Sequence, residues 1–447
     1  MVGARYSWSA SIFYLGYIVG AYPAMVLAQR YPVHWVAFAL VTLWGLCLIL
    51  TVVCTNFQQL YTQRFFLGLL EAGICKSLLP RHDPPSLTYA APMFMLIVGS
   101  WYEKKEQATR MGIWYSITGF VSVISPLVNY GFGSLDGDHG WKYMYYFGGA
   151  LTIIWGVALL WVLPGDPVSA KGFDERERYI LVARLRSNNS GVRNTHFKVE
   201  QCLELLLDLK FWLCFAIAFL GMIANGPIST FIPIIIGGFG YSRLNSLLLM
   251  MPCGAWSGGM TVLACWLAFK LPNARNWLVI ACLAGTLQAA LLLWLLPLSS
   301  KAGLLWAMFT LPSLGGAYGV LMGLQMANCA GYTKRSLASS GLYIGYCLGN
   351  FVGPLVFKQK DAPRYGPGFV IVSIAIAVSI LLSLVLRYLC VWENNKRDKA
   401  GIPEGFDNAF QDDSTDIKVR FCLTRRIKGF KLTCSFLESS IPLHLVI

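Results

Sequence analysis

Long apolar blocks run through the chain, and each is long enough to cross a lipid bilayer. The candidate spans cover residues 9–28, 35–54, 57–74 together with 92–101, 111–132, 144–163, 211–236, 245–269, 277–298, 303–326, 337–357 and 367–389. A spanning α-helix needs roughly 20 residues, whereas a spanning β-strand is signalled by about ten residues of alternating polarity. The blocks therefore predict an all-α polytopic membrane protein with about eleven spans.

The composition agrees with this class, because 56% of the residues are hydrophobic and only 13% are charged. A soluble domain carries about 25% charged residues. The net charge of +14 does not indicate a nucleic-acid partner, since the basic residues lie mainly in the loops and the tail. The cysteines are scattered singly through apolar runs, and no CxxC, HExxH, GxSxG or Walker-type motif occurs. We therefore expect no enzymatic activity, no metal site and no cofactor.

A polar stretch at 165–210 divides the spans into five and six. We predict a helical half at 1–164, a central loop at 165–210, a second helical half at 211–389 and a tail at 390–447. Most lysines and arginines lie on the side of the loop and tail, and cytoplasmic loops carry that excess. The central loop and the carboxyl terminus are therefore predicted to be cytoplasmic. The tail beyond Ala400, with little periodic apolar pattern, is expected to be disordered.

The third span is interrupted at residues 75–91. This segment contains three prolines and the charged residues Lys76, Arg81 and Asp83, which neither continue a helix nor sit in hydrocarbon. Removing it joins Ile74 to Pro92 and restores one membrane length. We interpret 75–91 as an inserted segment, for example a retained intron. A genuine re-entrant loop or a lumenal excursion is the alternative.

Two charges stand out inside the spans. Arg64, Gly68 and Glu71 lie at i, i+4 and i+7, which places them on one helix face with a glycine between the charges. An arginine there can hold a carboxylate in a bidentate fork, and a buried glutamate can carry a proton. Alternatively, Arg64 extends to the membrane surface, and Glu71 is its partner or faces another helix.

Uncharged polar residues inside the spans are candidates for lining a solvated path, although such a residue more often joins two helices. The set comprises Tyr115, Asn129, Asn225, Gln325, Asn328 and Asn350. Glycines at 341, 345, 349 and 353 recur every fourth residue and predict a smooth helix face for close packing. Such a face favours helices that slide or rock.

These features together resemble the major facilitator superfamily, and more narrowly the fungal allantoate permease branch of the anion:cation symporters. The segments that carry the resemblance are RFFLGLLEAG at 64–73, SWYEKKEQATRMGIWYS at 100–116, QMANCAGYTKR at 325–335 and GNFVGPLVFKQKDAPRYGPGF at 349–369. The resemblance implies two six-helix halves, alternating access and proton-driven uptake of a small organic carboxylate at the plasma membrane. Members differ in substrate.

Under this resemblance, Arg64 holds the substrate carboxylate and Glu71 carries the proton. Tyr115, Asn129, Asn328 and Asn350 line the cavity. The expected partners are the carboxylate, protons and the bilayer, with no cofactor beyond the proton gradient.

Three departures from the family pattern suggest a second hypothesis. The chain begins near the family's second helix, Ala21 stands where the family often has glutamate, and the resemblance ends at Asp416. The alternative is a non-transporting membrane sensor, or an inactive truncated or mis-spliced transporter.

Overall fold

The structure is a computed structural model that describes residues 5–30, 33–74, 104–134, 140–162, 174, 176–177, 198–271, 273–329 and 332–400. Helices account for nearly all of these residues, and none of them forms a β-strand. Five long helices precede the central polar stretch, with one short 3-10 turn between the second and third. They are α1 (Arg5–Arg30), α2 (Val33–Leu50), η1 (Thr51–Val53), α3 (Phe57–Ile74), α5 (Lys104–Gly133) and α6 (Gly140–Val162).

Near the end of the central stretch, the short helix α8 (Val199–Leu207) leads into six helical passages, several of them broken by proline. They are α9 (Leu209–Ile223) with η2 (Pro227–Phe231) and α10 (Ile232–Gly238), α11 (Arg243–Leu248) with α12 (Met251–Lys270), α13 (Arg275–Leu295), α14 (Lys301–Thr310) with η3 (Leu311–Ser313) and α15 (Leu314–Ala327), α16 (Tyr332–Val356), and α17 (Gly366–Ala400). The turn η4 (Gln359–Asp361) lies between the last two.

The described helices confirm the predicted all-α polytopic fold. They coincide with the predicted spans except at 92–101, which lies outside the described residues. One difference is that α17 continues past residue 389 to Ala400. No glycine or proline occurs between Gly368 and Gly401, so the helix persists beyond its apolar part. The predicted insertion at 75–91 and the tail after Ala400 lie outside the described residues. The proposed boundaries at 164, 210 and 389 stay predictions.

Four of the predicted spans are less apolar than the others. Seven passages in the described ranges are long and apolar enough to cross a membrane by composition alone. The four predicted spans outside that set lie in α1, α3, α5 and α16. Three of these four form the contacts between bundles, since α1 packs on α16 and α5 packs on α12. Their lower hydropathy fits surfaces that face protein instead of lipid tails.

Small residues let the helices of the first bundle approach closely. A Cβ added to Gly68 of α3 would collide with the backbone carbonyl of Phe13 in α1, and one added to Gly16 would collide with that of Phe65. The predicted close approach at Gly68 is therefore made by another helix. Membrane helices associate through such small residues because lipid supplies no hydrophobic drive between them.

The glycine stripe of α16 packs within its own bundle. Gly341 and Gly345 face Phe211 and Phe215 of α9, and Gly349 lies against the carbonyl of Phe219. The stripe therefore joins α16 to α9, and this differs from the expectation of a sliding surface. The helix turns its other faces toward α1 and α8.

One arginine caps the carboxyl end of α13. The Arg364 Nη2 atom donates to the carbonyl oxygens of Trp294, Leu295 and Leu296 at 2.9, 3.3 and 3.2 Å. A cation at a helix carboxyl terminus satisfies open carbonyls and complements the helix dipole.

We expect Arg364→Ala to lower the free energy of unfolding by about 1 kcal/mol, because these charge-assisted bonds are lost. Thermal unfolding followed by tryptophan fluorescence in detergent measures the change. Lys360→Ala is the matched control, since Lys360 is an exposed cation of the same connection. Equal midpoints for Arg364→Ala and wild type would exclude the capping role.

Candidate functional site

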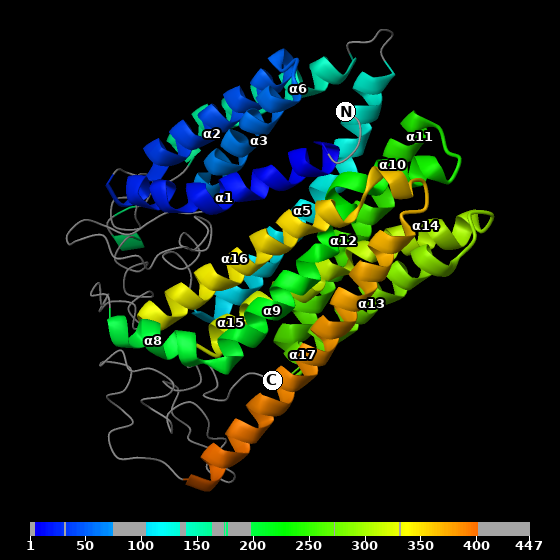
Figure 1. Cartoon of the computed structure of the whole chain (residues 1–447). Helices are drawn as coiled ribbons and strands as arrows, with labels where there is room; N and C mark the ends of the chain where they lie inside the picture. Colours follow the sequence, from blue (N-terminus) through cyan, green and yellow to red (C-terminus); the bar gives the residue numbers. More distant parts are fainter. Residues whose placement is uncertain are drawn as a thin grey trace.

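The two bundles meet along two helix pairs, α1 with α16 and α5 with α12. Figure 1 shows that α1 lies close to α16 at the first residues of α1, and that the two helices separate toward α8. Three hydroxyl groups join the bundles at the end where α1 begins. The Ser7 and Ser11 hydroxyls donate to the carbonyls of Phe357 and Phe351 at 3.1 and 2.7 Å, and the Tyr6 hydroxyl donates to Thr230 at 3.1 Å. We call these three bonds the Ser7–Ser11 contact.

The second helix pair is held by backbone contact. A Cβ added to Gly119 of α5 would collide with the backbone of Gly258 in α12, and one added to Gly254 would meet the backbone of Ser122 at 2.7 Å. The contact between α5 and α12 therefore depends on glycine on both sides. Such close approach leaves no space between these helices at that level.

A continuous series of tyrosines crosses the middle of the contact region. The ring centroid of Tyr115 in α5 lies 5.8 Å from that of Tyr318 in α15. The Tyr318 centroid lies 5.0 Å from that of Tyr346 in α16. Tyr346 stacks on Tyr343 at 5.5 Å, and Tyr343 lies 5.3 Å from Tyr17 of α1. This tyrosine row joins both bundles. Such ring contacts contribute attraction beyond the area they bury, so the row helps to hold the two bundles together.

Arg64 and Glu71 lie on α3 about 10 Å apart by helical rise. The Arg64 Nη2 atom donates to the Tyr145 hydroxyl of α6 at 3.4 Å, and the arginine is half-buried. The structure records no ion pair between Arg64 and Glu71, both of which it describes. Glu71 is half-buried, near Tyr14 of α1.

Asn350 is buried in α16 and bonds to the break in the passage that begins with α9. Its Oδ1 atom accepts from Asn225 Nδ2 at 2.6 Å, and its Nδ2 atom donates to the Tyr346 carbonyl at 2.8 Å. Asn225 directly precedes Gly226 and η2, where α9 ends. Asn350 therefore lies next to the tyrosine row, through Tyr346.

The other predicted lining residues are separated from this centre. Asn129 is half-buried near the end of α5, four residues before Gly133. Asn328 is buried directly after α15, near the opposite end of the second bundle. Of the six predicted site residues, Tyr115 and Asn350 are connected through Tyr318 and Tyr346, whereas Arg64 and Glu71 lie on α3, which packs on α1 and α2.

The sequence interpretation missed most of the tyrosine row. Tyr14 and Tyr17, like Tyr343 and Tyr346, are spaced by three residues, which puts each pair on one helix face. That spacing was a usable signal. It does not identify the partner helix, which only the packing reveals.

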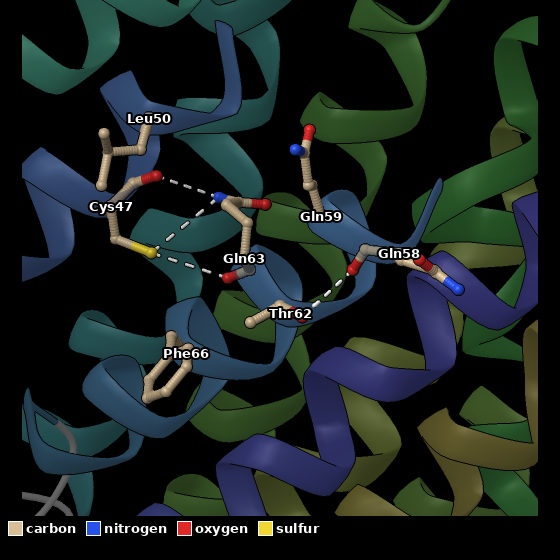
Figure 2. A pocket seen from close by; sticks show the side chains of 7 residues that line it. All are labelled: Cys47, Leu50, Gln58, Gln59, Thr62, Gln63 and Phe66. Atoms are coloured by element: carbon tan, nitrogen blue, oxygen red, sulfur yellow. Dashed lines mark hydrogen bonds between the residues drawn. The ribbon is translucent and has the colours of Figure 1, made fainter. Parts of the chain in front are cut away.

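A cavity of about 460 Å³ lies between α2 and α3, and Figure 2 shows the seven residues that line it: Cys47, Leu50, Gln58, Gln59, Thr62, Gln63 and Phe66. The amide groups of two lining glutamines form hydrogen bonds to backbone atoms of the first bundle. Gln63 Nε2 donates to the Cys47 carbonyl at 3.0 Å, and Gln59 Oε1 accepts from the Thr55 backbone at 2.9 Å, near the start of α3. All its lining residues come from the first bundle, so this cavity is separate from the contact between bundles.

Relatives among characterised and sequenced proteins match most of the chain. It is 31% identical over 424 residues to the transporter C417.10 of Schizosaccharomyces pombe, covering 94% of this chain and 80% of that protein. It is 30% identical to the allantoate permease of Saccharomyces cerevisiae, with 94% and 77% covered. The thiamine pathway transporter of the same yeast is 27% identical, with 89% and 73% covered.

The fold is also similar to solved transporter structures. The partially occluded, inward-open xylose transporter XylE from E. coli superposes with a TM-score of 0.57 at 12% identity, covering 85% of each chain. A bacterial homologue of the human lysosomal transporter Spinster gives 0.53 at 15% identity, covering 86% of this chain and 88% of that one. The sequence profile described as Major Facilitator Superfamily matches residues 87–354. With two helical bundles joined through α1, α5, α12 and α16, the chain belongs to the major facilitator superfamily of membrane transporters.

Proposed function

We propose that the protein is a proton-coupled symporter that takes up a small organic carboxylate across the plasma membrane. The observation that carries the proposal is the position of Arg64. This half-buried cation of a membrane helix has the neutral Tyr145 hydroxyl as its recorded hydrogen-bond partner among the described residues. A cation at membrane depth is costly unless an anion compensates it, and a carboxylate fits the guanidinium fork.

The name of one relative supports the same substrate class. Allantoate permease is 30% identical to this chain, and allantoate is an organic carboxylate. The substrate would bind between the bundles. Arg64 of α3 would supply the charge, Tyr115 of α5 and Asn350 of α16 would line the site from the two bundles, and Asn129 and Asn328 would line the path toward the two ends. Repeat-built carriers bind their substrates at such a midplane position.

Alternating access would proceed by rocking of the two bundles. The arrangement of α1 and α16, joined at one end and apart at the other, supports an inward-facing state with the Ser7–Ser11 contact closed. Opening to the outside would break these three hydrogen bonds. Each is a side-chain bond to a backbone carbonyl, which contributes only about 0.5–1.5 kcal/mol net and can be exchanged in a transport cycle.

Uptake measurements test the proposal. Proteoliposomes containing the purified chain receive a panel of labelled carboxylates, with and without an inward proton gradient. We expect accumulation of at least one carboxylate that depends on the gradient. Binding without accumulation would support the sensor alternative, and absence of both would support an inactive product. Antibody access to a carboxyl-terminal tag in intact and permeabilised cells tests the plasma-membrane location and the predicted cytoplasmic tail.

Glu71 is the proposed proton carrier, and replacing it separates coupling from binding. We expect Glu71→Gln to abolish gradient-driven accumulation and to retain exchange of labelled for unlabelled substrate, because glutamine keeps the shape but carries no proton. Glu71→Asp serves as the control that preserves the titratable group. Undiminished accumulation by Glu71→Gln would remove Glu71 from the mechanism.

Removing the two serine hydroxyls of the Ser7–Ser11 contact should favour the outward-open state. We expect Ser7→Ala with Ser11→Ala to shift the equilibrium by about 1–3 kcal/mol, the net value of two hydrogen bonds. Spin labels on non-natural amino acids at Asn56 and Lys360, both exposed near this end, report the opening as a longer mean distance.

The matched control for this shift is Thr62→Ala. The Thr62 hydroxyl bonds only within its own helix, to the Gln58 carbonyl at 3.1 Å, among the bonds recorded for it. The same distance distribution in the double variant and in Thr62→Ala would contradict a gating role for the serines.

A further inference from the structure

The short helix α8 exposes most of its aliphatic side chains and turns Gln201 toward the protein. Gln201 and Leu205 are buried, whereas the side chains of Val199, Leu203, Leu206 and Leu207 are exposed, Leu207 by 86%. A helix that borders water normally shows the reverse pattern. The exposed face therefore needs a partner other than water.

Buried ionic bonds hold α8 in this orientation. The Lys334 ammonium of α16 is 0% exposed and donates to Glu204 Oε1 and Asp208 Oδ2, each at 3.0 Å. The Lys334 backbone N–H also donates to Gln201 Oε1 at 3.1 Å. Turning α8 over would leave a buried cation without its carboxylates, which is strongly unfavourable. The outward apolar face is thus imposed by the packing of the polar face.

The exposed face of α8 continues directly into the outer surface of a membrane-spanning helix. Leu209 and Trp212 of α9 are exposed, and Trp212 Nε1 donates to the Leu206 carbonyl at 2.8 Å. In Figure 1, α8 lies beside the first residues of α16 and leads into α9. Tryptophan is enriched where a membrane meets water, because its ring is apolar and its N–H is polar.

We propose that α8 lies in the lipid interface of the leaflet on the side of the central polar stretch, with Val199, Leu203, Leu206 and Leu207 inserted among the acyl chains. The occupant is lipid because the face is continuous with the lipid-facing surface of α9 and consists of aliphatic side chains. Glu200, also exposed, borders this face and can reach the headgroups. Interfacial helices bind in this manner, with their apolar side below the headgroups.

Insertion of α8 in the lipid interface would also constrain the contact between the bundles. Lys334 belongs to α16, and α16 also packs on α1 of the first bundle. A helix fixed in the interface therefore holds one end of α16 at a constant depth while the bundles move. The proposal does not depend on the identity of the substrate or on whether the chain transports.

Photo-crosslinking of the full chain in nanodiscs of phosphatidylcholine tests the placement. The photoreactive residue p-benzoylphenylalanine replaces Leu207, and intact-protein mass spectrometry detects covalent lipid. Ile374, an exposed residue of the spanning helix α17, gives the lipid-facing reference, and Glu177 in the charge-rich central stretch gives the polar reference. We expect a lipid adduct at position 207 in a yield similar to that at 374 and above that at 177.

Two results would overturn the proposal. One is a yield at position 207 equal to that at 177 while position 374 reacts with lipid. The other is a crosslinked dimer, which would assign the face to a second copy of the chain. If the probe at 207 prevents monodisperse elution, the probe at Leu203 on the same face decides between the same outcomes.

Discussion

Replacing Arg64 by lysine is expected to raise the KM for carboxylate uptake by about ten- to a hundredfold. A charge-assisted hydrogen bond contributes about 1.5–3 kcal/mol, and each 1.4 kcal/mol corresponds to a factor of ten. Lysine keeps the positive charge but offers a point ammonium in place of the planar fork, so the second bond to the carboxylate is lost. Concentration-dependent uptake into proteoliposomes measures the change.

Arg5→Lys is the matched control, because it makes the same substitution at the surface. The Arg5 guanidinium stacks on the Phe57 ring at 4.3 Å, at the first end of α1 and away from the tyrosine row. We expect its uptake kinetics to stay near wild type. If Arg64→Lys shows the same KM as Arg5→Lys, Arg64 does not bind the substrate, and its bond to Tyr145 serves the structure only.

The second large effect is expected at Lys334. Replacing it by alanine should lower the free energy of unfolding by about 3–5 kcal/mol, because Glu204 and Asp208 would keep buried charges without the cation that compensates them. Both carboxylates lie 3.0 Å from the Lys334 ammonium, which is fully buried. Thermal unfolding of the purified protein in detergent measures the loss.

A double-mutant cycle separates the ionic bond from simple packing. If the loss comes from an uncompensated carboxylate, Lys334→Ala combined with Glu204→Gln should be more stable than the sum of the two single changes predicts. Lys210→Ala serves as the comparison for the loss of stability in Lys334→Ala. Lys210 also forms an ion pair, with Glu393 at 3.0 Å, but at a more exposed position. Additive losses would show that Lys334 contributes by filling space.

The chain of spans could be predicted from the sequence because insertion into a bilayer depends on local apolar length. The predicted blocks agree with α1 to α3, α5, α6 and the six passages after the central stretch. Helical periodicity likewise placed Arg64, Gly68 and Glu71 on one face of α3. The close approach at Gly68 follows from the same rule, although periodicity could not say that α1 is the helix that approaches.

Only the tertiary structure decided which distant residues meet. The tyrosine row takes rings from α1, α5, α15 and α16, and the bond between Asn225 and Asn350 joins residues 125 positions apart. The outward face of α8 also depends on Lys334, 130 positions beyond Glu204. Periodicity reports which side chains share a face of one helix, but the partner of that face is set by how the whole chain packs. For this reason the spans could be predicted from local sequence, whereas the centre of the bundle and the orientation of α8 could not.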